Sequence, residues 1–329
     1  MALKDDVLKV LMDNVGEYIS GEVISNSFNV SRTAIWKAMK KLEAEGYEIT
    51  STTNKGYKLL SVPDKVTSTE IKYNLNTVSF GQDIVFKEVV DSTNTLAKQL
   101  ARDGVAEGTI VVAEEQIAGK GRQGKVWSAP KGTGIWMSIV LRPKLEPQYA
   151  SQLTLLAGLS MCTAIRDVTG LEAMIKWPND LVLNNKKITG ILTEMSAEIE
   201  GINYVVIGIG VNVNIMEFDE DLTHATSLAL EGGKKYKRSK LIRRFLEIFE
   251  YDYNNYIDDG NLSRVLDRYK RYCVSLDKEV KIIKGGNERI AYATDITPGG
   301  ALKVTYIDTN ETEDIIAGEV SVRGIYGYV

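Results

Sequence analysis

The chain has 329 residues, a formal net charge of −4 and two cysteines, Cys162 and Cys273. Its length predicts about two or three domains. Its 44% hydrophobic and 26% charged residues are typical of folded proteins, which excludes a disordered or low-complexity chain. The cysteines lie far apart, so we expect no disulfide scaffold or zinc module and a reducing, cytoplasmic setting. No apolar stretch reaches about 18 residues, so we expect no membrane partner.

The chain contains one histidine, His224. This argues against Ser-His-Asp and Cys-His relays and against most zinc hydrolase sites, which need imidazole ligands or bases. No partner motif surrounds His224, so we expect a structural or surface residue and no dedicated metal site.

Residues 1–60 predict helices followed by a hairpin. Val7 and Leu11 begin a helical spacing of apolar residues, and Ser20 and Ser31 are placed to cap two further helices. Alternating apolar residues on either side of the polar run 51–56 predict a β-hairpin. Together these elements predict a winged helix-turn-helix domain over residues 1–64.

The third predicted helix of this domain is basic. Residues 1–60 carry 8 Lys/Arg and 8 Asp/Glu, so the total charge does not decide between DNA binding and a solvated basic face. The cations gather on the helix that such a fold inserts into the major groove, which favours DNA. The predicted DNA-contacting residues are Ser31, Arg32, Thr33, Trp36, Lys37, Lys40 and, at the hairpin tip, Lys55.

The rest of the chain predicts an α+β domain and a small β domain. A connector over residues 63–70 leads to a helix capped by Thr67 or Ser68, where we expect the central domain to begin. Strands are predicted over 84–90, 109–113, 134–141, 181–183, 188–195 and 204–214, and helices over 94–102, 149–168 and 238–257. These elements predict a central domain with a mixed β-sheet over residues 65–272. Short strands at 279–283, 290–296, 301–306 and 320–325 predict an SH3-like β-barrel over residues 273–329.

A glycine-rich basic loop follows the second strand of the central domain. No acidic residue lies between Glu115 and Glu146, whereas six lysines and arginines do. Residues 119–124 fit GxGxxG, but no helix signal follows and no acid comes about 20 residues later, which argues against a dinucleotide-binding turn. We expect a mobile loop whose amides and Arg122 close on a phosphate-bearing ligand, with Trp127 able to stack on a base. A flexible basic surface loop is the alternative.

Three further segments indicate a ligand site. Residues 176–180, Lys-Trp-Pro-Asn-Asp, predict a turn before a hairpin that brings a lysine to the start of a strand, where it can offset phosphate charge. Alternation over residues 207–214 places Gly208, Gly210, Asn212 and Asn214 on one face, which is left open for a ligand. Ser92 and Thr93 lie at a helix N-terminus, where they either donate to a ligand or simply cap the helix.

In this combination and order, the motifs resemble the bifunctional biotin protein ligases that also repress the biotin operon, over nearly the whole chain. The resemblance implies a central domain similar to class II aminoacyl-tRNA synthetases. It implies a biotin site of Ser92, Thr93, Asn94, Gln116, Gly119, Lys120, Gly121, Arg122, Lys187, Gly208 and Gly210. It implies an ATP and adenylate site of Arg122, Trp127, Asn179, Asp180, Lys187, Asn212 and Arg323. The implied catalytic residues are Arg122 and Lys187, which is preferred to Lys186 because it lies three residues before a glycine.

The implied activity is ATP-dependent biotinylation. Biotin and Mg-ATP would give biotinyl-5′-AMP, and biotin would pass to a lysine of a biotin carboxyl carrier protein. The adenylate would also act as corepressor of biotin synthesis genes, by stabilising a homodimer that binds operator DNA. Family loops commonly carry arginines where this chain has Lys120, Gln123 and Lys125, which predicts looser adenylate retention. The alternatives are a lipoate-type ligase and a ligand-sensing repressor with an inactive ligase domain.

Overall fold

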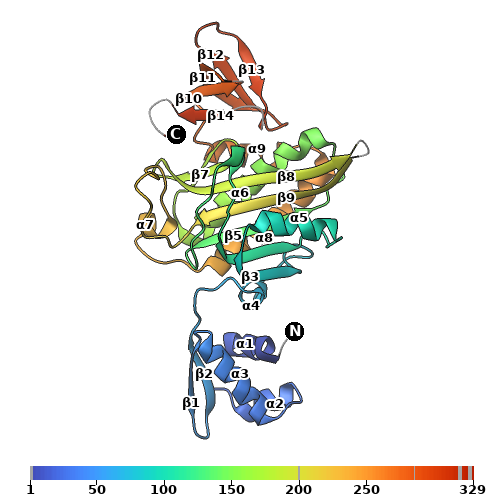
Figure 1. The fold of residues 1–329 in the computed structure, drawn as a ribbon, viewed down its shortest axis with the longest axis vertical. Helices are drawn as coiled ribbons and strands as arrows, with labels where there is room; N and C mark the ends of the chain where they lie inside the picture. The colour runs from blue at the N-terminus through green and yellow to red at the C-terminus, as the bar shows by residue number, and fades with distance from the viewer. Residues whose placement is uncertain (1–2, 199–200, 285, 318–320, 325–327) are drawn as a thin grey trace. The chain divides into compact units, whose positions relative to one another are not determined.

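The computed structural model describes residues 3–198, 201–284, 286–317, 321–324 and 328–329 (Figure 1). The chain divides into two compact units, Met1–Asn74 and Leu75–Val329. No helix in the described ranges is long and apolar enough to cross a membrane.

The first unit is the predicted winged helix-turn-helix. Its elements are α1 (Leu3–Asp13), α2 (Gly21–Ser27), α3 (Arg32–Ala44), the hairpin of β1 (Glu48–Thr52) and β2 (Gly56–Ser61), and α4 (Ser68–Lys72). Ser20 Oγ accepts from Glu22 N and Ser31 Oγ from Ala34 N, each at 3.2 Å, so both predicted helix caps are confirmed.

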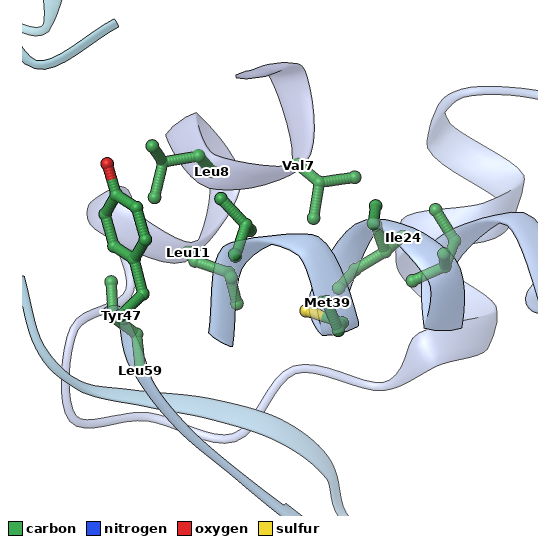
Figure 2. Packing of buried hydrophobic residues seen from close by; sticks show 10 residues of the cluster. Val7, Leu8, Leu11, Ile24, Met39, Tyr47 and Leu59 are labelled. Carbon is green, nitrogen blue, oxygen red and sulfur yellow. The ribbon is translucent and has the colours of Figure 1, made fainter. Parts of the chain in front are cut away.

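One core holds this unit together. Figure 2 shows side chains that α1, α2, α3, β2 and the residue before β1 bring to it, including Val7, Leu8, Leu11, Ile24, Met39, Tyr47 and Leu59. All seven are at most 3% exposed. Burial of this apolar surface is the main force that holds three short helices and a hairpin together.

The first unit extends beyond residue 64, where we expected the central domain to start. Helix α4 belongs to the first unit, and the Tyr73 hydroxyl next to it donates to the Met12 carbonyl of α1 at 3.0 Å. Thr67 occupies the N-cap position of α4, as predicted, but its side chain makes no capping hydrogen bond, and the helix that follows belongs to the first unit.

A mixed sheet forms the centre of the second unit. Within the described residues it has seven strands, in the order β3 (Ile84–Val90), β4 (Ile110–Gln116), β5 (Gly134–Leu141), β9 (Gly201–Asn212), β8 (Lys186–Glu198), β7 (Asp180–Leu183) and β6 (Met174–Lys176). Only β3 and β4 are parallel, so the predicted mixed sheet is confirmed. Helix α5 (Thr93–Arg102) packs on β4, β5 and β9, and α6 (Ala150–Thr169) packs on β8 and on α8 (Arg238–Asp259).

The two faces of this sheet differ. Gly208 and Gly190 face Asn94 and Trp127, on the side of α5. The adjacent β8 residues point to the opposite side, where Ile191 contacts Gly158 and Thr193 bonds Thr154, both of α6. A binding site on the α5 side therefore rests on a sheet whose other face is closed by packed helices.

The predicted strand over 204–214 ends at Asn212. The side chain of Asn214 bonds the backbone of Tyr236, accepting from its N–H at 3.0 Å and donating to its carbonyl at 2.9 Å. These bonds turn the chain out of the sheet. Two short helices were missed by the sequence pattern, α7 (Leu228–Gly232) and α9 (Ser263–Tyr272).

The predicted small β domain follows α9. As far as the structure describes it, it is an antiparallel sheet in the order β13 (Thr312–Ile315), β12 (Leu302–Tyr306), β11 (Asn287–Ile296), β10 (Lys278–Lys284) and β14 (Ser321–Gly324). Strand β13 was not predicted, because it is four residues long and buries only Ile315.

Candidate active site

A cavity of about 1090 Å³ in the second unit gathers the predicted ligand residues. Segments far apart in the chain line it: the start of α5, the end of β4, the glycine loop, strands β7 to β9 and residues 215–225. The predicted residues that line it are Ser92, Thr93, Asn94, Gln116, Lys120, Gly121, Arg122, Trp127, Asn179, Asp180, Lys187, Gly208, Gly210 and Asn212.

Gly119 and Arg323 are the two predicted residues outside this lining. Gly119, the first residue of the loop, lies against the backbone of Trp127. Its carbonyl accepts from Trp127 N at 2.9 Å, and a Cβ on Gly119 would lie 2.4 Å from the Trp127 carbonyl oxygen. Its glycine is required by this close backbone approach. The backbone of Arg323 pairs with Lys281 in the β14–β10 ladder, and its side chain lies outside the described part of the chain.

Ser92 and Thr93 lie where α5 begins, beside the end of β4. The backbone N and Oγ1 of Thr93 both donate to Gln116 Oε1, at 2.8 and 3.0 Å. Ser92 occupies the N-cap position of α5 but makes no capping hydrogen bond with its side chain. Simple capping by the Ser92 side chain is therefore wrong. The residue is 3% exposed and lines the cavity.

Asn94 is held by protein groups at both ends of its amide. Ser138 Oγ donates to its Oδ1 at 2.6 Å, and its Nδ2 donates to Glu194 Oε2 at 2.9 Å. Lys98 Nζ lies 2.5 Å from the other oxygen of Glu194. Burial opposes ionisation of Glu194, but hydrogen bonds from Lys98 and Asn94 outweigh it and lower its pKa.

Sequence reasoning missed Ser138 and Glu194. Ser138 could have been found, because it is the one hydroxyl in the apolar strand over residues 134–141, and a fully buried hydroxyl needs a polar partner.

The glycine face of β9 lines the cavity, but it is not empty as we expected. A Cβ on Gly208 would lie 2.1 Å from Asn94 Oδ1, and one on Gly210 would lie 2.6 Å from Trp127 Cε2. Gly190 of β8, paired with Gly210, faces the same indole. The glycines thus admit two side chains that themselves line the cavity. Trp127 Nε1 is buried with no hydrogen-bond partner among the described residues, which leaves a donor for a ligand.

The two adjacent lysines at the start of β8 have different surroundings. Lys187 Nζ lies 2.7 Å from Asp180 Oδ1 and 5.3 Å from the centre of the Trp127 ring system. Its backbone N donates to the His224 carbonyl at 2.6 Å. Lys186 is exposed and does not line the cavity. The structure thus brings Lys187 into the site and leaves Lys186 outside it.

Arg122 reaches across the cavity from the glycine loop. Its Nη1 donates to Asn179 Oδ1 at 2.6 Å, which joins the loop to the turn before β7. The loop contains only a 3-10 turn, Arg122–Gly124, and strand β5 follows it. No helix begins on these glycines within the described residues, which confirms that the GxGxxG pattern is not a dinucleotide-binding turn.

His224 is exposed, as a surface residue would be, and it also lines the cavity. Its ring stacks on Tyr328, with 5.8 Å between ring centroids and 29° between planes. The lining segment around it was missed because its polar sequence carries no motif; it contributes Ile215, Glu217, Phe218, Asp219, Asp221, Leu222 and Ala225.

In the first unit, the predicted DNA-contacting residues are all exposed: Ser31, Arg32, Thr33, Trp36, Lys37, Lys40 and Lys55. Arg32 forms an ion pair with Glu22, and Lys40 one with Glu43 at 2.6 Å. Trp36 is 50% exposed on α3, although a large aromatic side chain is usually mostly buried.

Comparison with known proteins identifies both units. Residues 86–212 match the Biotin/lipoate A/B protein ligase family, and residues 4–58 match an HTH domain. The bifunctional ligase/repressor BirA of Bacillus spizizenii is 42% identical over 78% of this chain and 80% of its own length. The Escherichia coli protein of the same name is 30% identical over 94% of each chain.

A solved structure gives the same result for the fold. The biotin protein ligase from Aquifex aeolicus, in complex with biotin and ATP, superposes with a TM-score of 0.65 at 27% identity, covering 74% of this chain and 99% of that one. With relatives of this similarity over nearly its whole length, this chain belongs to the family of bifunctional ligase/repressor BirA proteins.

Proposed function

We propose that this chain joins biotin to ATP, transfers the biotinyl group to a lysine of a biotin carboxyl carrier protein, and represses biotin synthesis genes when it holds biotinyl-5′-AMP. The observation that carries the ligase proposal is the convergence of Lys187, Arg122 and Trp127 on one cavity. Cationic and aromatic groups in one cavity suit a ligand with a carboxylate, a phosphate and a base.

In the first step, a biotin carboxylate oxygen attacks the α-phosphorus of ATP and pyrophosphate leaves. Lys187 carries positive charge to the reacting oxygens, and its ion pair with Asp180 holds the ammonium group at a defined place. Arg122 is tethered to Asn179 through one nitrogen, so its other N–H groups remain to contact phosphate. Mg²⁺ enters as part of the ATP substrate.

In the second step, the amine of the acceptor lysine attacks the acyl carbon of the adenylate and AMP leaves. Water competes with this amine, so the adenylate must be covered until the acceptor arrives. The glycine loop, residues 119–125, is the segment placed to cover it, because it borders the cavity. Lys120 bonds Thr95 at 2.9 Å on one side of the loop, and Arg122 bonds Asn179 at 2.6 Å on the other.

The ligase proposal is tested by incubating the protein with ATP, Mg²⁺, biotin and a biotin carboxyl carrier fragment, and measuring the fragment's mass. A biotin-sized gain that requires ATP is expected. Lipoate in place of biotin separates the lipoate-type alternative. Biotin binding without any gain on a competent acceptor would favour a repressor with an inactive ligase domain.

For the repressor activity we propose that the adenylate stabilises a homodimer whose two winged helices bind two operator half-sites. The exposed basic residues of α3 support this proposal. Sedimentation with and without biotinyl-5′-AMP, followed by operator binding at the same protein concentrations, tests it. Equal dimer fractions and equal operator affinity in both conditions would contradict the corepressor role.

A further inference from the structure

Tyr328 lies outside every predicted motif, yet it lines the same cavity as Lys187. Its hydroxyl donates to Asp180 Oδ2. The Lys176 ammonium lies 3.5 Å from the centre of its ring, and its ring stacks on His224. Three contacts of different kinds thus fix one side chain from the C-terminal β domain in the centre of the ligase unit.

Two of these contacts involve the groups that hold Lys187. Asp180 uses its other oxygen, Oδ1, to bind Lys187 Nζ at 2.7 Å. The His224 carbonyl accepts the backbone N–H of Lys187 at 2.6 Å. Tyr328 therefore touches both the residue that orients the ammonium group and the residue that anchors the backbone beneath it.

The phenol is suited to donate to a carboxylate. Burial, followed by the negative charge of Asp180, raises the pKa of Tyr328, so the hydroxyl remains protonated at neutral pH. A carboxylate with one oxygen fixed by such a donor has fewer orientations available to the other oxygen. Asp180 is 14% exposed and Lys187 26%, so this restraint acts where water competes only weakly.

We propose that Tyr328 is a positioning residue for adenylation, which holds Asp180 and the His224 segment so that Lys187 is directed at the reacting oxygens. The inference rests on the proposed ligase function. Its consequence is that the C-terminal β domain completes the active site. Small displacements of a charged group from the reacting atoms are costly in rate, so the phenol hydroxyl is expected to affect turnover more than substrate binding.

The first test uses Tyr328→Phe, which keeps the ring over Lys176 and against His224 and removes only the hydroxyl. We expect kcat for biotin-dependent pyrophosphate release to fall about tenfold, with biotin affinity and thermal unfolding unchanged. Tyr251→Phe is the matched control, because Tyr251 is a 71% exposed tyrosine on α8. A kcat within twofold of wild type for Tyr328→Phe would overturn the proposal.

The second test asks whether Tyr328 acts through Asp180. In a double-mutant cycle, Tyr328→Phe should add almost nothing to the loss caused by Asp180→Ala, because the partner of the hydroxyl is already gone. Independent, additive losses would overturn the proposal. A wild-type protein that releases no pyrophosphate would instead refute the ligase function itself, so the two failures are distinguishable.

Discussion

Lys187 and Lys186 are neighbours of the same chemical type, and only their surroundings separate them. Lys187 faces Asp180 and Trp127, whereas Lys186 is exposed. A positive charge held by fixed partners needs little reorganisation as negative charge develops, which is how preorganised sites stabilise a transition state.

Lys187→Ala should therefore lower the rate of adenylation by about 100-fold or more. Lys186→Ala, the matched control one residue away, should stay close to wild type. Pyrophosphate release with biotin and ATP measures both, and thermal unfolding followed by circular dichroism reports whether the fold is kept. Equal rates for the two variants would contradict the assignment of Lys187.

Gly210 depends on the absence of a side chain. A Cβ at this position would lie 2.6 Å from the Trp127 indole, so Gly210→Ala must displace that ring. We expect a higher KM for ATP and faster loss of the adenylate. Gly158→Ala is the control. Gly158 lies inside helix α6, where alanine is favoured over glycine, and the new methyl would be at an ordinary contact distance of 3.6 Å from Ile191. An unchanged KM in Gly210→Ala would remove Trp127 from the nucleotide site.

At the scale of elements, Glu250 joins α8 to the loop before β3. Its carboxylate accepts the backbone N–H groups of Ser79 and Phe80 at 2.7 and 2.8 Å through one oxygen, and that of Val78 at 2.8 Å through the other. Burial raises its pKa, but these backbone donors outweigh it, so the pKa lies below its ordinary value of 4.5.

Glu250→Gln should reduce the free energy of unfolding by about 1–3 kcal/mol at neutral pH, because an amide cannot accept all of these bonds. The folded pKa is lowered, so this contribution is present above pH 4.5 and is lost as the pH falls through the folded value. The difference from wild type in urea unfolding should shrink at acid pH. Glu172→Gln, at a side chain 84% exposed, is the control and should change little. A difference that grows at acid pH would contradict this account.

Helix α3 offers Lys37 as an exposed cation for a phosphate. We expect Lys37→Ala to weaken operator binding for all sequences alike and to lower the slope of log affinity against log salt by about one. Lys72→Ala on α4 is the control, and ligase activity should stay at the wild-type rate in both variants. An unchanged salt slope in Lys37→Ala would place α3 away from the DNA backbone.

At the scale of the whole molecule, the chain divides after Asn74. A match to 74% of this chain covers 99% of the Aquifex aeolicus ligase. That ligase therefore has no room for a counterpart of a unit as large as Met1–Asn74. We therefore expect a fragment of residues 75–329 to retain adenylation and biotin transfer at rates near wild type and to lose operator binding. Loss of adenylation in a fragment that is still folded by circular dichroism would show that catalysis requires the first unit.

The order of the domains, most of the strands and most of the cavity lining were predictable from the sequence, because they rest on local patterns; the short strands β6 and β13 were not. Serine caps, alternating strands, the glycine face of β9 and the basic loop are each determined by residues close together in the chain. The family resemblance then selected Lys187 from two adjacent lysines, which no local pattern could do.

The tertiary structure alone decided which groups hold the site in place. Ser138 and Glu194 reach Asn94 from different strands, Trp127 lies against glycines of β8 and β9, and Tyr328 joins Asp180 to His224. These partners are separated by tens to more than a hundred residues, so no periodicity connects them. Their contacts depend on which strands pair and which faces they share, and that arrangement arises only when the sheet has formed.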